Sequence, residues 1–223
     1  MRRDINGGII LLAHRIEALK NRRANILGHE QSLKTAVLLP LVEWDGKICV
    51  LFEKRSLTLK HQPGEICFPG GMKDPDDPQA LDTAIRETCE ELGITPDNIE
   101  VIGELDTLIT PSSLIMRSFV AWIKDGSVIE VNPDEVEKVF MIPLDFLLQY
   151  GPKEHILRLK PDFSDDFPLQ LIPHGANYPF RLNRLQQYFY LWEGEVIWGL
   201  TARILHHFIE LLKDNEQSNT GEL

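Results

Sequence analysis

The sequence predicts an α/β protein, an α/β/α sandwich in which helices cover both faces of a mixed sheet. Two observations support this class. Segments with the composition of strands lie on both sides of an amphipathic helix, and a long amphipathic helix follows the last of them. Strands interrupted and followed by helices pack most readily as layers on one sheet. The 223 residues are 43% hydrophobic and no Ser/Gly/Pro-rich linker divides them, which suits one substantial core.

The chain is expected to consist of a helical extension, one domain and a tail. Residues 1–32 form the N-terminal extension, with an amphipathic helix near residues 8–21. Residues 33–213 form the single domain. Residues 214–223 are polar and are expected to fray.

Six strands are expected in the domain. The first two, residues 34–42 and 47–54, flank a predicted hairpin turn at residues 44–46. Residues 151–184 show no clear period and are expected to be extended and rich in loops. The other expected strands are residues 99–108, 116–123, 135–141 and 187–192.

Two helices are expected in the second half of the chain, a short one after Pro143 and a long one over residues 198–213. His206 and His207 are adjacent in the long helix and point about 100° apart, so we interpret them as structural rather than as ligands of one metal. The long helix has a regular apolar stripe, typical of core packing, formed by Thr201, Ile204, Leu205, Phe208, Leu211 and Leu212.

The central helix is predicted over residues 78–92. Asp77 suits the N-cap, Pro78 the first helical position, and Gly93 the left-handed residue that closes a helix. Its apolar stripe, which should pack on the core, is formed by Leu81, Ala84, Ile85, Thr88 and Leu92. Three carboxylates fall together on the neighbouring face: Glu87, Glu90 and Glu91.

These carboxylates have no folding reason to share a face. Glu87 is a neighbour of both others, and each like-charged pair costs an isolated helix roughly 0.2 to 0.5 kcal/mol. Glu90 and Glu91 also lie in the last turn, where the helix dipole disfavours anions, and Arg86 offsets only part of this. A solvated acidic face is the ordinary explanation of such a run. The Phe-Pro-Gly-Gly turn before the helix favours a divalent-cation site instead, and oxygen ligands suit Mg²⁺ or Mn²⁺.

At these residues the chain resembles the Nudix hydrolase family, whose box ends in Arg-Glu, an apolar residue, any residue, Glu-Glu, any residue and Gly. Residues 86–93 (RETCEELG) fit this half, with Thr88 where an apolar residue is usual. The first half departs from the pattern, because Gly71 lies one residue too far from Arg86 and the isolated glutamate of the box is missing. We interpret Asp77 as the helix cap of a variant box. The resemblance implies the Nudix α/β/α sandwich.

A second motif occupies residues 55–71 (RSLTLKHQPGEICFPGG). It resembles the motif of the coenzyme A diphosphatase branch of the Nudix family: Arg-Ser, three residues, Arg, three residues, Gly, three residues, Phe-Pro-Gly-Gly. Lys60 replaces the second arginine, and every other fixed position is met. The longer box and the WGLTA sequence at residues 198–202 are also usual in this branch. The resemblance implies hydrolysis of the pyrophosphate bond of coenzyme A, or a derivative, to 3',5'-ADP and 4'-phosphopantetheine.

The resemblance also implies roles for residues of the box. Glu87 and Glu91 would bind the metal directly. Glu90 would be a further ligand or would orient the attacking water, with Arg86 fixing Glu90. In Nudix enzymes a backbone carbonyl near the box glycine helps to hold a metal, which implies Gly71 here.

The catalytic base comes either from the box or from a distant loop acid in this family. Asp134 and Glu135 are the candidates outside the box, and Glu135 matches the usual Glu-Val better. A turn cap before a strand explains both residues equally well.

Arg55, Lys60 and Gly70 are the candidate substrate-binding residues. Arginine can bind a phosphate with two donors, whereas lysine acts more as a point charge. Gly70 and Gly71 would let a ligand approach the backbone closely. Ordinary surface cations and a plain tight turn are the alternatives that the sequence leaves open.

The net charge of −11 argues against broad binding to nucleic acid or to anionic membranes. Three widely spaced cysteines fit reduced thiols, and the C-terminal Gly-Glu-Leu is no peroxisomal address, so a cytoplasmic location is expected. The expected partner is a small-molecule pyrophosphate substrate, and a homodimer is left open. Two alternatives remain: a Nudix pyrophosphatase of another nucleoside diphosphate derivative, such as ADP-ribose or NADH, and a non-catalytic binding protein with this fold.

Overall fold

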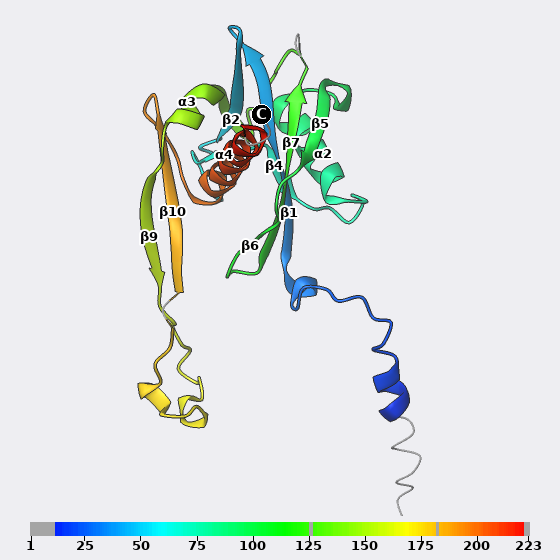
Figure 1. The fold of residues 1–223 in the computed structure, drawn as a ribbon, viewed down its shortest axis with the longest axis vertical. Helices are drawn as coiled ribbons and strands as arrows, with labels where there is room; N and C mark the ends of the chain where they lie inside the picture. Colours follow the sequence, from blue (N-terminus) through cyan, green and yellow to red (C-terminus); the bar gives the residue numbers. More distant parts are fainter. Residues whose placement is uncertain (1–11, 125–126, 182, 221–223) are drawn as a thin grey trace, which may run out of the picture.

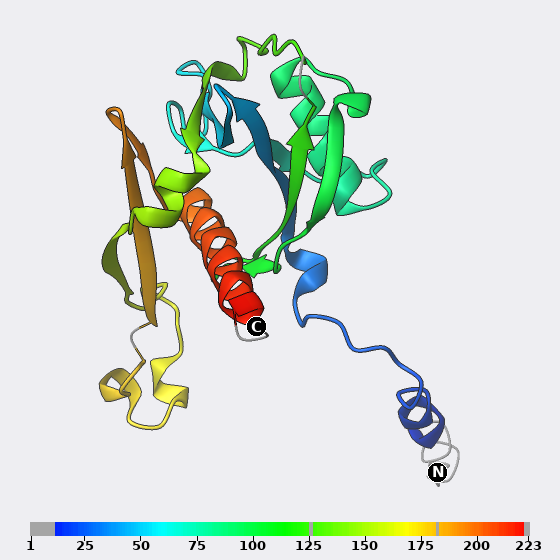
Figure 2. The same cartoon turned by 45° about the horizontal axis from the view of Figure 1, so that its top comes forward.

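A computed structural model of the chain describes residues 12–124, 127–181 and 183–220. The strands of its main sheet are β1 (Leu33–Trp44), β2 (Lys47–Arg55), β3 (Ile66–Cys67), β4 (Gly70–Met72), β5 (Ile99–Glu104), β6 (Leu108–Ile109), β7 (Leu114–Ile123) and β8 (Val136–Pro143). They follow the order β3-β2-β1-β7-β5, with β4 paired to β1, β6 to β7 and β8 to β2. Two long helices, α2 (Ala80–Leu92) and α4 (Gly199–Thr220), cover opposite faces of this sheet (Figures 1 and 2). The predicted α/β/α sandwich is confirmed.

The first strand shows why the sheet has two cores. Successive side chains of a strand point to opposite faces. Val37 and Leu39 therefore belong to the core beneath α4, and Ala36 and Leu38 to the core beneath α2. Because both faces are covered, this strand is apolar almost throughout rather than alternating.

The predicted hairpin between the first two strands is confirmed. Trp44 pairs with Lys47, and the two residues between them, Asp45 and Gly46, have φ of 52° and 67°, as a tight hairpin turn with a right-handed twist requires. On its other side β1 pairs in parallel with β7. A parallel pair needs a long crossover connection, and α2 lies within it.

The start of α2 differs from the prediction. The helix begins at Ala80 rather than Pro78, and its N-cap is Gln79, which forms a capping box with Asp82. The prediction of Asp77 as the helix cap is therefore wrong. The Asp77 carboxylate instead accepts hydrogen bonds from Arg86 and Thr83, and the sequence does not show these contacts. The predicted end is confirmed, with Gly93 in the left-handed conformation at φ 66°.

A second sheet lies beyond the first and is built from β9 (Lys153–Leu159), β10 (Asn183–Trp192) and β11 (Glu195–Ile197). Residues 151–184 were expected to be extended and rich in loops; residues 153–159 are extended, but the regular strand that they form was not predicted. Nearly all residues of this strand are exposed, so it lacks the alternation that marks a half-buried strand, and its pairing with β10 holds it extended. The hairpin stands away from the main sheet, with residues 160–181 at its end (Figure 1).

The remaining elements mostly follow the prediction. A short helix, α3 (Leu144–Gln149), follows Pro143 as expected. The strand expected over residues 99–108 is interrupted into β5 and β6. The long helix α4 buries Leu205 and Phe208 but continues past the predicted end at residue 213 to Thr220, so the expected tail is helical there. Among the described residues, four single turns of 3-10 helix complete the fold: His29–Gln31, Pro96–Asn98, Leu169–Leu171 and Gly175–Asn177.

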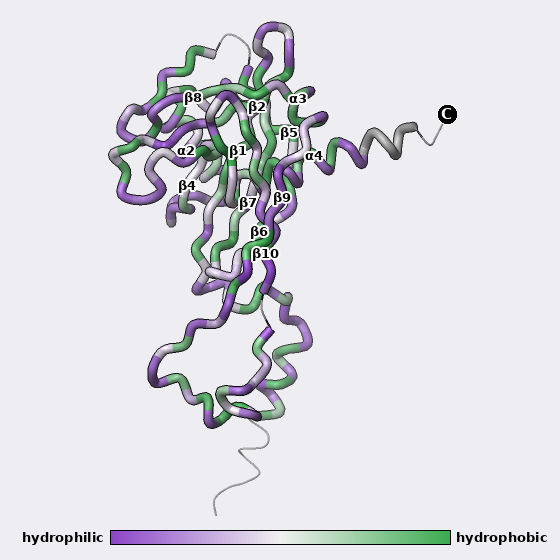
Figure 3. Tube along the Cα trace, turned by 90° about the vertical axis from the view of Figure 1, so that its left-hand side faces the viewer, coloured by the Kyte–Doolittle hydropathy of each residue, from purple (hydrophilic) through white to green (hydrophobic). Residues whose placement is uncertain are grey.

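The N-terminal segment lies apart from the sheet in Figure 1. Residues 12–17 are helical, and the rest of the helix expected near residues 8–21 falls partly outside the described residues. In Figure 3 hydrophobic residues gather on the central strands, whereas the loops around α2 are largely hydrophilic. Within the described part of the chain, no helix has the length and apolar character needed to cross a membrane.

Candidate active site

The last two turns of α2 face the glycine turn that forms β4. The Glu91 carboxylate is 4% exposed, and its Oε2 accepts a hydrogen bond of 2.8 Å from the backbone N–H of Gly70. Glu87 lies against Gly71, where a β-carbon would come within 2.6 Å of its Oε2. Gly70 has φ 148°, and a β-carbon there would meet the backbone of Val37 at 2.6 Å. Glycine is therefore required at position 70 by the backbone, whereas at position 71 a β-carbon would displace the Glu87 carboxylate.

A fourth carboxylate, which the sequence analysis missed, enters from β2. Glu53 is 1% exposed, and its Oε1 accepts a hydrogen bond of 3.1 Å from the Cys67 thiol. Its Oε2 has no hydrogen-bond partner among the described residues. The available signal was the strand period: Glu53 follows Cys49 and Leu51 at two-residue steps, and these two face the core beneath α2.

Burial and mutual repulsion disfavour the charged forms of these groups. Burial raises the pKa of Glu91 to about 9, and the charges of Glu53, Glu87 and Glu135 add to the effect. Burial likewise raises the pKa of Glu53 to about 7, against the lowering effects of the Cys67 thiol and of a nearby arginine. The pKa of Glu87 is raised mainly by burial too. Ionisation of all of these groups would therefore place more negative charge in the site than its protein surroundings compensate.

Arg86 organises the outer side of the cluster. Its guanidinium contacts Glu90 at 3.2 Å, as expected, but it also contacts Glu87 at 2.9 Å and Asp77 at 3.1 Å. Asp77 in turn accepts a hydrogen bond from Thr83 Oγ1 at 2.9 Å. The Arg86 guanidinium holds the pKa of Asp77 well below its usual range. Asp77 therefore anchors the arginine instead of capping the helix.

The carboxylates of α2 differ in exposure. The Glu90 side chain is 54% exposed and that of Glu87 is 18% exposed, so Glu90 lies at the rim while Glu87 and Glu91 lie inside. Glu135 is half-buried, and its charge raises the pKa values of all three inner carboxyl groups, Glu53, Glu87 and Glu91. Asp134 is exposed. Of the two loop acids, the structure brings Glu135 to the cluster.

The two candidate phosphate-binding cations are placed differently. Arg55 lies close enough to Glu53 for its charge to lower that pKa, and one of its terminal nitrogens donates to the His61 carbonyl at 3.4 Å. Its Nε is buried without a partner among the described residues. Lys60 is exposed and forms no ion pair or hydrogen bond within the described part of the chain. Arg55 therefore belongs to the site as it stands, whereas no contact connects Lys60 to it among the described residues.

These residues fit a divalent cation. The donors are carboxylate and carbonyl oxygens, the preferred ligands of Mg²⁺ and Mn²⁺. The unpartnered Glu53 Oε2 and the excess of buried negative charge are what a cation would satisfy. Among the described residues, no three His, Cys, Asp or Glu side chains already surround one point. In this arrangement the Glu87 carboxylate is paired with Arg86 at 2.9 Å.

Comparisons with known proteins find the following similarities. A family model described as a NUDIX domain matches residues 32–160. The chain is 34% identical over 181 residues to Nudix hydrolase 3 of Caenorhabditis elegans, which covers 79% of this chain and 72% of that protein. It is 39% identical over 120 residues to a peroxisomal coenzyme A diphosphatase of Mus musculus, covering 54% of this chain and 51% of that protein. A solved structure of a C. elegans Ap4A hydrolase complex is 21% identical with a TM-score of 0.43, covering 52% of this chain and 83% of that one.

Proposed function

Because this chain belongs to the Nudix family of pyrophosphohydrolases, with the family model matching more than half of its length, we propose that its substrate is coenzyme A or a coenzyme A derivative. The products would be 3',5'-ADP and 4'-phosphopantetheine. The observation that carries this proposal is the motif at residues 55–71, whose first residue, Arg55, and last residues, Gly70 and Gly71, all lie at the carboxylate cluster. The name of the mouse relative supports the same substrate.

The proposed cofactor is Mg²⁺ or Mn²⁺. Glu87 and Glu91 would hold it, with the Gly71 carbonyl and the newly found Glu53 as further oxygen donors, and Glu90 at the rim as an outer ligand. When bound, such a cation neutralises the phosphate oxygens that repel a nucleophile and lowers the pKa of water. Glycine at position 71 lets Glu87 approach the turn, so the turn and the helix present their oxygens together.

The chain's own residues would then position the reactants. Glu135 is the proposed base, because it is the loop acid that faces the cluster. Arg86, anchored by Asp77, is a positioning residue that holds Glu87 and Glu90. Arg55 would pair with the pyrophosphate, with Lys60 and the Gly70 turn at its border. A guanidinium beside buried carboxylates can bind a phosphate without cancelling the whole negative charge of the site.

The direct test is to incubate the protein with Mg²⁺ or Mn²⁺ and coenzyme A and to separate the products. Appearance of 3',5'-ADP supports the proposal. Cleavage of ADP-ribose or NADH without 3',5'-ADP from coenzyme A would instead favour a Nudix pyrophosphatase of another substrate. Metal binding with no turnover on any pyrophosphate would favour a non-catalytic binding protein.

We also propose a cytoplasmic location. The mouse relative's name places that protein in peroxisomes, so the two compartments are the alternatives to compare. Fractionation of cells that express the untagged chain separates them, and recovery with a peroxisomal marker enzyme would contradict this proposal.

A further inference from the structure

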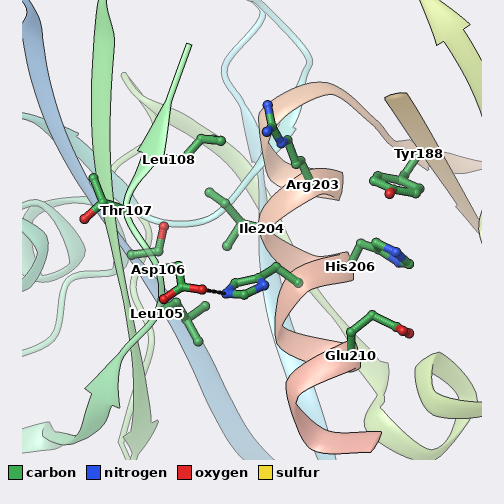
Figure 4. A pocket seen from close by; sticks show the side chains of 11 residues that line it. Leu105, Asp106, Thr107, Leu108, Tyr188, Arg203, Ile204, His206 and Glu210 are labelled. Atoms are coloured by element: carbon green, nitrogen blue, oxygen red, sulfur yellow. Dashed lines mark ion pairs between the residues drawn. The ribbon is translucent and has the colours of Figure 1, made fainter. Parts of the chain in front are cut away.

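A groove on the opposite face of the sheet from α2 is not used by the chemistry proposed above. It encloses about 330 Å³ and lies between β6 and β10, with α4 as its floor (Figure 4). This volume is at the lower end of the range for small-molecule sites. Its wall on the β6 side combines two leucines, Leu105 and Leu108, with the polar Asp106 and Thr107. On the β10 side the Tyr188 ring stacks on His206 with centroids 3.9 Å apart.

The charges of the groove leave one cation uncompensated. Asp106 contacts His207 at 3.2 Å across the groove, and Glu210 contacts Lys213 at 3.2 Å. Arg203, one turn into α4, forms no ion pair or hydrogen bond with any described residue. Glu210 is therefore paired with a lysine, and the Asp106 contact is an ion pair only when His207 is protonated, which leaves Arg203 as the lining cation without an ion pair among the described residues.

A buried hydroxyl in the same lining also lacks a partner. Ser118 is 1% exposed, and its Oγ forms no hydrogen bond within the described part of the chain. Buried polar groups are nearly always hydrogen-bonded, so an unpaired one calls for an explanation. A bound ligand with oxygen or nitrogen atoms would satisfy this hydroxyl.

The sheet register links the groove to the carboxylate cluster. Ser118 and Gly70 pair with the same residue of β1, Val37, from opposite sides. Neighbouring strands are spaced by about 4.8 Å, so the two positions lie on the order of 10 Å apart. Gly70 is the residue whose N–H bonds Glu91. Val37 faces the core beneath α4, so a ligand with a phosphate at the glycine turn would have to pass from the α2 side of the sheet to the α4 side, and then span about two strands to reach the groove.

We propose that this groove binds the 3'-phosphoadenosine half of coenzyme A, with Arg203 pairing with the 3'-phosphate. This inference rests on the proposed function. A guanidinium suits a phosphate dianion because it offers two parallel donors. The adenine would lie against the Tyr188 ring, and the Ser118 hydroxyl would bond to the base or ribose. The pantetheine arm carries no charge and would leave Arg203 unused, so we assign it to the other side of the pyrophosphate.

The kinetic test compares coenzyme A with 3'-dephospho-coenzyme A as substrates of the full chain. Loss of one charge-assisted contact is expected to lower binding by about 10- to 100-fold. Arg203→Met should therefore reduce the ratio of the two kcat/KM values, coenzyme A over its dephospho form, by that factor. The matched control, Arg158→Met on exposed β9, should keep the wild-type ratio. An unchanged ratio in Arg203→Met would overturn the assignment.

A binding test separates this proposal from the proposed function. Calorimetric titration of 3',5'-ADP and of 5'-AMP needs no turnover. The wild type should bind 3',5'-ADP at least about 10-fold more tightly, and Arg203→Met should remove this preference. If the wild type cleaves neither coenzyme A form, the proposed function fails, but an Arg203-dependent preference for the 3'-phosphate would still uphold the groove. Equal binding of both nucleotides to the wild type would overturn the groove assignment even if coenzyme A is cleaved.

Discussion

Replacement of Glu91 by glutamine should make the metal-free protein more stable at neutral pH. Glu91 is buried beside Glu53 and Glu87, and its pKa is raised to about 9, mainly by burial. A glutamine oxygen can still accept the hydrogen bond from Gly70, so the change removes the charge and keeps the contact. Above the pKa that the carboxyl has in the unfolded chain, folding must either protonate Glu91 or bury its charge, and both cost free energy. Glutamine removes this cost.

The pH dependence follows from the direction of the shift. A raised pKa means that the folded state binds more protons than the unfolded state, so the stability is full below pH 4.5 and falls as pH rises toward about 9. One such group costs about 1.4 kcal/mol per pH unit in this range. Between pH 5 and pH 7, Glu91→Gln should gain about 3 kcal/mol over the wild type. For a chain of this size, that difference corresponds to roughly 6 to 12 °C in Tm.

The assay is urea unfolding in a chelator at pH 5, 6 and 7, followed by fluorescence and circular dichroism. Glu90→Gln is the matched control, because its carboxylate is 54% exposed in the same helical turn, and it should not change the slope with pH. If the difference in unfolding free energy between Glu91→Gln and the wild type is the same at all three pH values, the buried-charge argument is refuted. The same variant should lose the stabilisation by Mg²⁺ and nearly all pyrophosphatase activity.

Three further predictions concern other contacts. Gly71→Ala places a β-carbon against the Glu87 carboxylate and should weaken Mn²⁺ binding by at least about 10-fold, a loss measured by electron paramagnetic resonance; unchanged affinity would contradict the role of the turn. Asp77→Asn loosens Arg86 and should lower kcat. Because the pKa of Asp77 is lowered in the folded state, the stability that the Asp77 carboxylate adds to the wild type should be present near neutral pH and disappear as the pH falls during acid unfolding. Leu205→Ala empties a fully buried position beneath α4 and should cost about 2 to 5 kcal/mol in urea unfolding; a loss below 1 kcal/mol would contradict the packing described.

The prediction from sequence was best where local pattern and tertiary environment agree. The first two strands, their hairpin turn and the end of α2 at Gly93 were predicted because period and turn chemistry act over a few neighbouring residues. The strand β9 was missed because it is exposed on nearly all its length and is stabilised only by pairing with a segment more than twenty residues away. Its composition alone resembles a loop.

The site was predicted in part for the same reason. Glu87 and Glu91 are recognisable because three carboxylates on one helix face form a local pattern. Glu53 is a single charged residue in an apolar strand, and its place beside Glu91 depends on how β2 and α2 pack. Asp77 suited a helix cap by position, but Arg86 and Thr83 compete for its carboxylate in the folded chain. Such competition depends on distances in space and leaves no trace in spacing.

By itself the sequence determined the Nudix fold class, the helix with three clustered glutamates and the motif that points to coenzyme A, because each depends on residues close together along the chain. Only the tertiary structure decided which acids share one buried site, that Glu135 rather than Asp134 faces it, and that Arg203 stands uncompensated in a groove two strands away. The physical reason is that burial and electrostatic interaction depend on proximity in the folded state. Residues 53 and 91 come together on one face of the sheet, and residues 118 and 203 on the other, only when the sheet forms between its two helices.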